Sequence, residues 1–267
     1  MVPAFEDILY AVENQVAIIT INRPEVLNAF RVKTVNELIH AFRLADADPN
    51  VAAIIFTGAG DRAFSAGGDQ KEREHTGHER DVLTGEAARD MELHAAIRNT
   101  GKPVIAAVNG YAIGGGHVLH VLCDISLASE NAVFGQVGPK VGSFDAGYGT
   151  IVLARVIGEK RAREMWYFCR RYNAQEAYDM GLVNKVVPAD QLMTEAKSWA
   201  AELVDKSPTA LKFLKFSFNT DTAQAGGISS MAFAALDLYQ DSDEAREGNA
   251  AFNEKRPVDY SPYRRQS

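Results

Sequence analysis

The sequence predicts an α/β protein whose chain ends in a helical region. Two observations support this prediction. Apolar runs typical of strands alternate with helical patterns early in the 267 residues, whereas helical patterns dominate from residue 207 almost to the end. The apolar share of 46% and the charged share of 24% are those of an ordinary globular protein, and a chain of this length can bury a sizeable core.

The N-terminal part reads as strands separated by helices. The run VAIITI from residue 16 is rich in β-branched residues and ends shortly before Pro24, so it predicts a strand that enters a turn. Apolar residues at helical spacing predict an amphipathic helix over about residues 32 to 46. The segment VAAIIFTGAG at 51 to 60 predicts a buried strand closed by glycines. The polar stretch from Phe64 to about residue 86 predicts a loop over a site.

The middle of the chain continues this alternation. The segment MELHAAIRN predicts a helix, KPVIAAVNG a strand and GGGHVLHVLCD a helix led by glycines, while ISLAS and AVFGQ predict short strands. Further helices are predicted over REMWYFCRR, AQEAYDMGLV and ADQLMTEAKSWAAELVDK, with NKVVP near residues 184 to 188 between the last two. We expect a core over residues 1–200 and a helical region over residues 201–267.

Composition excludes several classes of function. A formal net charge of -7 argues against nucleic acid or an anionic membrane as the main partner. The N-terminus does not resemble a secretory signal, and no stretch approaches the ~18 uninterrupted apolar residues of a membrane span. The two cysteines, Cys123 and Cys169, are too few for a disulfide framework. We therefore expect a cytoplasmic protein with reduced thiols.

Two groups of glycines are candidates for an anion site. Gly114, Gly115 and Gly116 lie between a predicted strand and a predicted helix, so their amides have no Cβ in front of them. Gly67 and Gly68 end another strand segment, AFSAGGD. Two glycine amides directed at one oxygen atom would form an oxyanion hole, although glycines also simply close turns. A nucleotide site is poorly supported, because no segment matches a P-loop or the GxGxxG pattern.

Motifs along nearly the whole chain resemble those of the crotonase (enoyl-CoA hydratase/isomerase) superfamily, in order and spacing: NRPEVLNAF, AFSAGGD, GKPVIAAVNGYAIGGG, CDISLAS, FGQ, MGLVNKVVP and FNEKRP. The resemblance implies a crotonase-like ββα spiral core over residues 1–200 and a helical C-terminal trimerisation region over residues 201–267. It also implies an acyl-CoA substrate, a homotrimer or dimer of trimers, and no tightly bound cofactor. The amides of Gly68 and Gly115 would bind the thioester oxygen as an enolate develops.

The resemblance also bears on the reaction. Hydratases of this family carry two glutamates where this chain has Val118 and Gly138, and neither residue can transfer a proton, which disfavours simple hydration. The segment GQVGPKVGSFDAGYG at 135 to 149 is similar to that of 1,4-dihydroxy-2-naphthoyl-CoA synthase, which forms a ring, and of 2-ketocyclohexanecarboxyl-CoA hydrolase, which opens one. Both reactions make or break a carbon–carbon bond β to a thioester. MELHAAIR, FGQVGPK and the C-terminal segments NTDTAQAGGISSM and ALDLYQDSDEAREG look closer to the hydrolase, whereas GGDQKER and GGGHVL look closer to the synthase. Ring opening is slightly favoured.

Several residues match the functional positions of these two enzymes. Ser143 and Asp145 would contact the reacting oxygen and shuttle its proton, although an aspartate here could also form a turn. The GGDQKER and FNEKRP motifs imply contacts with the substrate or with CoA, while solvated charges on a loop remain the alternative for Lys71 and Arg73. The implied substrate or CoA contacts are Asp69, Gln70, Lys71, Arg73 and Lys255.

An anion site is implied at the position of the missing glutamate. In the synthases whose glycine matches Gly138, bicarbonate fills the vacated carboxylate position. Gln136 and Trp166 match the residues that hold this ion, whereas Val137 replaces a threonine there. The resemblance therefore implies bicarbonate as a cofactor of the site, and Val137 is the departure that counts against its binding.

The catalytic tyrosine of the synthases is displaced in this chain. That residue acts in a neighbouring subunit's site, and the gapless match falls on Gln240, with Tyr239 immediately before it. A shift of one residue turns a helical side chain by about 100°. Either the helix register differs and Tyr239 acts, or the enzyme works without this acid.

Three other readings remain. His117, His120 and Cys123 share one helical face and could bind zinc, but no fourth ligand is evident and they can equally face the core, so we expect no metal. A non-catalytic CoA-binding protein would keep the glycines without turnover. An enoyl-CoA hydratase or isomerase is the main alternative.

Overall fold

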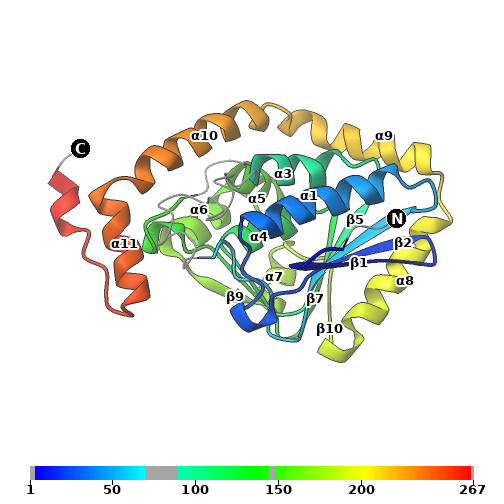
Figure 1. Cartoon of the computed structure of the whole chain (residues 1–267), viewed down its shortest axis with the longest axis horizontal. Helices are drawn as coiled ribbons and strands as arrows, with labels where there is room; N and C mark the ends of the chain where they lie inside the picture. Colours follow the sequence, from blue (N-terminus) through cyan, green and yellow to red (C-terminus); the bar gives the residue numbers. More distant parts are fainter. Residues whose placement is uncertain (1–3, 70–89, 145–147, 266–267) are drawn as a thin grey trace.

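The structure is a computed structural model that describes residues 4–69, 90–144 and 148–265. Within these residues, strands form two sheets and helices cover both faces of the larger sheet, as Figure 1 shows. The predicted α/β class and the helical C-terminal region are both confirmed. No described helix is long and apolar enough to cross a membrane.

The larger sheet is mostly parallel, with the order β1-β2-β3-β5-β7-β10 and only β1 antiparallel to its neighbour. Its strands are β1 (Ile8–Glu13), β2 (Val16–Ile21), β3 (Ala53–Gly58), β5 (Val104–Val108), β7 (Ile125–Ser129) and β10 (Lys185–Val187). The smaller sheet has the order β4-β6-β8-β9, with β4 (Ala63–Ser65), β6 (Tyr111–Ile113), β8 (Val133–Gly135) and β9 (Arg171–Asn173). The strands predicted within 16–21, 51–60, KPVIAAVNG, ISLAS and AVFGQ are thus confirmed.

Several elements had no prediction, and strand β1 and helix α5 (Tyr148–Ile157) are the longest of them. The hairpin of β1 and β2 turns through Asn14 and Gln15, whose φ angles of 48° and 65° give the twist that a two-residue hairpin needs without a glycine. Strand β1 is an edge strand with Leu9 and Val12 exposed, so its apolar pattern is weak.

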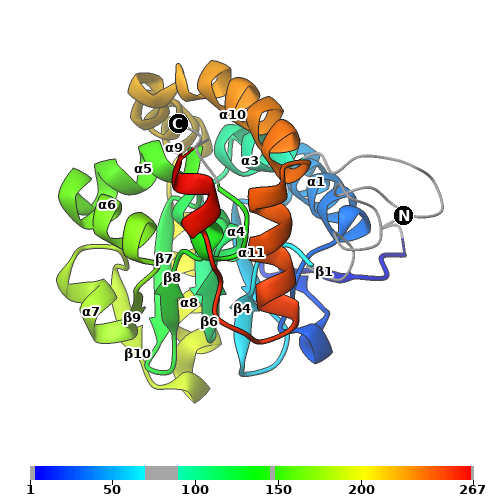
Figure 2. The same cartoon turned by 90° about the vertical axis from the view of Figure 1, so that its left-hand side faces the viewer.

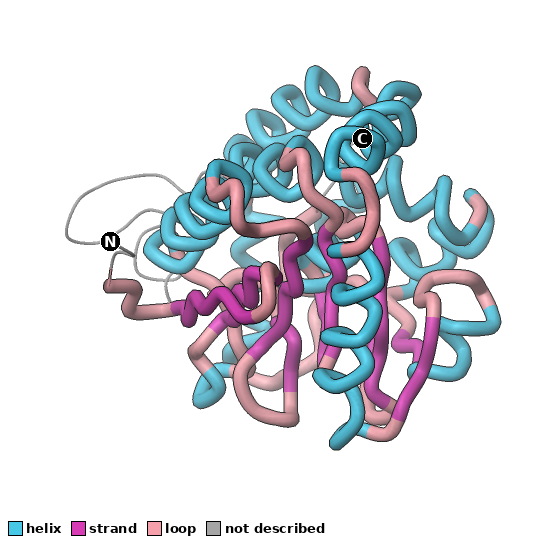
Figure 3. Tube along the Cα trace, turned by 90° about the vertical axis from the view of Figure 1, so that its right-hand side faces the viewer, coloured by secondary structure: helices cyan, strands magenta, loops and turns pink. Residues whose placement is uncertain are grey.

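Both faces of the larger sheet are buried, which explains its unbroken apolar runs. In β3, Ile54 and Phe56 belong to the cluster under α1 (Val32–Ala47), while Ile55 packs with α8 (Leu192–Val204) on the other face. Figure 3 shows α8 crossing in front of the strands, with most of the other helices above them. The domain boundary predicted at residue 200 falls inside α8.

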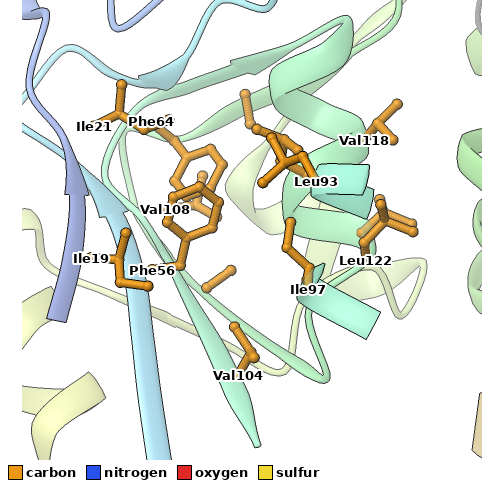
Figure 4. Packing of buried hydrophobic residues seen from close by; sticks show 14 of the residues in the cluster. Ile19, Ile21, Phe56, Phe64, Leu93, Ile97, Val104, Val108, Val118 and Leu122 are labelled. Carbon is orange, nitrogen blue, oxygen red and sulfur yellow. The ribbon is translucent and has the colours of Figure 1, made fainter. Parts of the chain in front are cut away.

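Helices α3 (Asp90–Asn99) and α4 (Gly115–Val121) complete the main core. Figure 4 shows Leu93 and Ile97 of α3 lying between the strands and the Val118 side of α4. Leu93, Ile97 and Val118 are all buried. Val118 is therefore a core residue. The other helices of this part of the chain are η1 (Pro24–Val26), η2 (Gly138–Lys140), α6 (Glu159–Phe168), α7 (Ala174–Asp179) and η3 (Ala189–Gln191).

The C-terminal arm consists of α9 (Pro208–Asn219), η4 (Thr220–Thr222), α10 (Ala225–Gln240), α11 (Asp243–Asn253) and η5 (Ser261–Arg265). Helices α9 and α10 run along the top of the molecule in Figure 1, and Figure 2 views the side on which α11 descends. Lys215 ties the arm to the core, because its buried ammonium donates to the carbonyls of Ile97 and Lys102 and to Asp124 Oδ2, the last at 2.7 Å.

Candidate active site

A cavity of about 90 Å³ lies where the smaller sheet meets α4, and both groups of glycines line it. The parallel pairing of β4 and β6 brings the two strand ends together, so the residues that follow each strand become neighbours. The described lining residues are Phe30, Ala66, Gly67, Gly68, His94, Gly114, Gly115, Gln136, Val137, Gly138, Val141, Ser143, Phe144, Trp166, Phe233 and Leu236.

The backbone forms one wall of the cavity. Gly67 has a φ of +91°, and a Cβ atom there would lie 3.1 Å from the amide nitrogen of Gly115. A Cβ atom on Gly115 would lie 2.6 Å from Phe30 Cζ. Only glycine permits this close approach of two chain segments.

Hydrogen bonds of the neighbouring residues indicate the direction of the Gly68 amide, and the start of α4 indicates that of the Gly115 amide. The Phe30 N–H donates to the Gly67 carbonyl and the Asp69 N–H donates to the Phe30 carbonyl, both at 2.9 Å. Because successive amides of an extended segment point to opposite sides, the N–H of Gly68 is directed away from Phe30. Gly115 is the first residue of α4, so its N–H has no acceptor within the helix. Backbone amides directed at one point of a cavity wall can stabilise an oxygen that gains negative charge.

The turn at 138–143 forms part of the opposite wall. The Ser143 N–H donates to the Gly138 carbonyl at 2.9 Å, which closes the turn tightly. A Cβ atom on Gly138 would lie 2.8 Å from the Ser143 carbonyl oxygen, so a glutamate does not fit there unless the turn moves. None of the described residues that line the cavity is an aspartate or a glutamate.

Two predicted anion-binding residues also line the cavity. Trp166 is buried, and its Nε1 has no hydrogen-bond partner among the described residues. The Gln136 side-chain amide makes a long contact of 3.4 Å to the Gly114 carbonyl. An orphaned indole N–H beside a glycine that cannot carry a side chain fits a small anion.

His94 is a cavity residue that the sequence reasoning missed. Its ring is 5% exposed and its Nδ1 has no partner in the described part of the chain. Burial lowers the pKa of His94 to about 4, so the imidazole is neutral at pH 7. Its only signal in the sequence is a polar residue next to Leu93 in a predicted amphipathic helix.

Tyr239 lies next to the cavity. It lines an adjoining cavity of about 400 Å³ that shares Ser143 and Phe144 with the first, and its ring centroid is 5.5 Å from that of Phe144. Burial, and then the charge of Glu244, raises the pKa of Tyr239 to about 12, so it remains protonated. Gln240 lines a third cavity, beneath α11.

The other predicted contacts lie apart from the cavity or outside the described residues. Asp69 is held by Arg23 at 3.1 Å. Lys255 is exposed just after α11 and is not among the described lining residues. Residues 70–89 and 145–147 are outside the described part of the chain, and these segments contain Gln70, Lys71, Arg73, Asp145 and most of the loop predicted over the site.

The histidines after the glycines pack in the core. Nδ1 of His117 lies 2.7 Å from Nε2 of His120, and both rings are fully buried. Burial lowers the pKa of both residues, so the pair is neutral. The Cys123 thiol donates to the Leu119 carbonyl at 3.3 Å. Among the described residues, no group of three or more His, Cys, Asp or Glu could hold a metal ion.

Comparison with known proteins places this geometry in context. A sequence model described as enoyl-CoA hydratase/isomerase matches residues 11–262. The fold is similar to an enoyl-CoA hydratase from Mycobacterium avium subsp. paratuberculosis K-10, with 29% identity, a TM-score of 0.84, and 97% of this chain and 100% of that chain covered. It is also similar to an enoyl-CoA hydratase/isomerase from Xanthobacter autotrophicus Py2, with 31% identity, a TM-score of 0.81, and coverage of 94% and 93%. An enoyl-CoA hydratase subunit I from Geobacillus kaustophilus HTA426 has 34% identity, a TM-score of 0.74, and coverage of 96% and 98%.

Proposed function

Because the chain belongs to the enoyl-CoA hydratase/isomerase family, we propose that Gly68 and Gly115 bind the thioester oxygen of an acyl-CoA and stabilise its enolate. We further propose that the enzyme makes or breaks the carbon–carbon bond β to the thioester, with opening of a 2-ketocyclohexanecarboxyl-CoA ring favoured over naphthoate-type ring closure. The position of Gly68 and Gly115 in the lining of one cavity supports both roles.

The observation that carries this proposal is the absence of a carboxylate among the described residues of the cavity wall. Hydration needs an acid and a base beside the double bond. Here Val118 is a core residue, and the turn around Gly138 excludes a longer side chain. Bond cleavage needs stabilisation of the enolate, which the backbone wall would supply, and a proton carrier at another position, for which we propose Ser143 with Asp145.

In the cleavage direction, a water-derived nucleophile adds to the ring ketone and the adjacent carbon–carbon bond breaks. The bonding electrons pass to the thioester, where the amides of Gly68 and Gly115 stabilise the enolate oxygen. A proton then returns to the α-carbon, and Ser143, with Asp145, is the proposed carrier. Ser143 lines the cavity between the glycine wall and Tyr239.

Trp166 and Gln136 would hold a bicarbonate ion beside Gly138, where the orphaned Trp166 N–H fits an anion. When bound, this ion would supply a base in place of the absent glutamate.

We also propose that the arm forms a homotrimer or a dimer of trimers. Large apolar side chains stand exposed along it, namely Phe213, Leu214, Phe216, Phe218, Ile228, Met231, Leu238 and Phe252. Many large apolar side chains exposed on one region are typical of a protein interface.

The decisive experiment is incubation with 2-ketocyclohexanecarboxyl-CoA and, separately, with o-succinylbenzoyl-CoA, with the products read by mass. Ring opening adds one water to the first substrate, whereas ring closure removes one water from the second. Gly68→Pro deletes the amide and should lower turnover by about 10²–10³-fold while the protein stays folded. A folded Gly68→Pro variant with full activity would contradict the assignment.

A second candidate is an enoyl-CoA hydratase or isomerase, which the descriptions of the similar solved structures favour. Loss of the enoyl absorption on crotonyl-CoA, with no turnover of either ring substrate, would establish it. Binding of acyl-CoA without any turnover would instead indicate a non-catalytic CoA-binding protein.

A further inference from the structure

His94 occupies a position in the cavity that neither the glycine wall nor the anion site explains. Its ring lines the same cavity of about 90 Å³ as Gly68 and Gly115, and its Nδ1 has no partner among the described residues. A buried ring nitrogen without a hydrogen bond costs free energy, so in a folded protein it calls for an explanation.

Apolar and aromatic contacts hold the ring in place. Leu93 and Ile97, on the same helix, are buried in the core and fix α3 (Figure 4). The ring of Tyr148 meets that of His94 edge-on at 6.3 Å, and the ring of Phe233 from the arm lies at 6.0 Å. The imidazole is therefore held by packing, and no described group takes up its buried Nδ1.

We propose that His94 donates a hydrogen bond from Nδ1 to a second carbonyl oxygen of the substrate, and so selects 3-oxoacyl thioesters over thioesters that lack the β-carbonyl. This inference rests on the proposed binding of the thioester oxygen by Gly68 and Gly115. In a 3-oxoacyl thioester only one carbon separates the two carbonyl groups, so a small cavity can hold both. A neutral imidazole suits this role, since it polarises a carbonyl without introducing a buried charge.

Trp166 is the other lining residue with an orphaned donor, and it provides the control. If the β-carbonyl were bound on that side, the preference for it would depend on Trp166. The remaining polar side chains of the described wall are Gln136, which contacts the Gly114 carbonyl, and Ser143.

The test compares acetoacetyl-CoA with butyryl-CoA, which differ only in the β-carbonyl. Binding is measured by calorimetry in the cold, and the ligands are checked by mass afterwards. The wild type should bind acetoacetyl-CoA up to about tenfold more tightly. In His94→Phe the ratio of the two affinities should fall to about one, with the affinity for butyryl-CoA unchanged. His94→Gln should keep part of the preference for acetoacetyl-CoA, and Trp166→Phe should keep all of it.

An equal fall in both affinities in His94→Phe would indicate a structural role and overturn the inference. A preference that survives in both His94 variants, or that Trp166→Phe removes instead, would also overturn it. If the wild type binds both ligands equally, the inference fails while the proposed function stands. If the wild type binds neither ligand, the proposed function fails, and the inference that rests on it fails as well. If His94→Phe does not fold, the smaller changes His94→Gln and His94→Asn are tested by the same ratio of affinities.

Discussion

The core buries its large apolar side chains, whereas the C-terminal arm exposes many of its own. In the core, Phe56 and Phe64 are fully buried and stack edge-on at 5.1 Å. In the arm, Phe218 is 71% exposed and Leu238 is 78% exposed. The difference indicates that the core is stabilised by its own packing, whereas the exposed apolar side chains of the arm support the proposed subunit interface.

The two regions meet at the cavity. Phe233 and Leu236 of α10 line it opposite residues that come from the sheets and α4. The arm therefore forms part of the cavity wall as well as carrying the exposed apolar side chains. Substitutions in the core and at Lys215, where the arm is joined to the core, should lower stability. Substitutions on the exposed face of the arm should change self-association.

The largest effect is expected in the core. Phe56→Ala leaves a cavity between closely packed rings and should lower the free energy of unfolding by about 4 kcal/mol. The matched change Phe218→Ala, on the exposed side of α9, should stay within about 0.5 kcal/mol. Urea denaturation at low protein concentration measures both. Similar losses in the two variants would mean that the arm is as well packed as the core.

The second largest effect is expected at Lys215, where the arm is joined to the core. Lys215→Met removes three hydrogen bonds and leaves the Asp124 carboxylate without its cation, so a loss of about 3 kcal/mol is expected. Lys212, one turn away and exposed, supplies the control variant Lys212→Met. Thermal unfolding and hydrogen exchange of α9 report the loss. Equal stability of the two variants would show that the hydrogen bonds of Lys215 contribute nothing to the free energy of unfolding.

The arm should govern assembly. Leu238→Glu places a charge on the exposed apolar surface and should weaken self-association by at least about 2 kcal/mol, or roughly thirtyfold. Light scattering over a dilution series measures the mass. The unfolding midpoint of the dissociated chain should not change. An unaltered oligomer mass would exclude this part of α10 from the interface.

The smallest effect concerns the C-terminal segment. Hydrogen bonds from Arg256, then the backbone N–H of Asp259, lower the pKa of Glu247 to about 2. A carboxyl whose folded pKa is depressed from 4.5 stabilises the segment above about pH 4.5, and this contribution is lost as the pH falls toward 2. The protection of residues 256–263 against hydrogen exchange, measured relative to the intrinsic rate at each pH, should therefore fall on acidification. In Glu247→Gln this protection should be low already at pH 7 and change little with pH.

The sequence predicts the core better than the site. Buried runs such as those of β3 and β5, and the amphipathic pattern of α1, are strong because both faces or one whole face are covered. Strand β1 is not evident, because an edge strand buries little and its turn contains no glycine.

The cavity depends on contacts between distant segments, which local patterns do not reveal. The glycines were found because they form motifs, and the structure places Gly68 and Gly115 on one wall. His94 and Phe233 belong to no motif, and only the packing of α3 against α10 brings them together. The roles predicted for the glycines, Ser143 and Tyr239 remain predictions.

The His117–His120 pair gives the site an intrinsic spectroscopic reporter. The two neutral rings share a short contact on α4, the helix that starts at Gly115, and they are shielded from solvent. Their nitrogen resonances in an isotope-labelled sample should lie far from those of surface histidines and stay constant across neutral pH. A shift on addition of an acyl-CoA would then record movement of the glycine wall directly, with no dye or turnover assay.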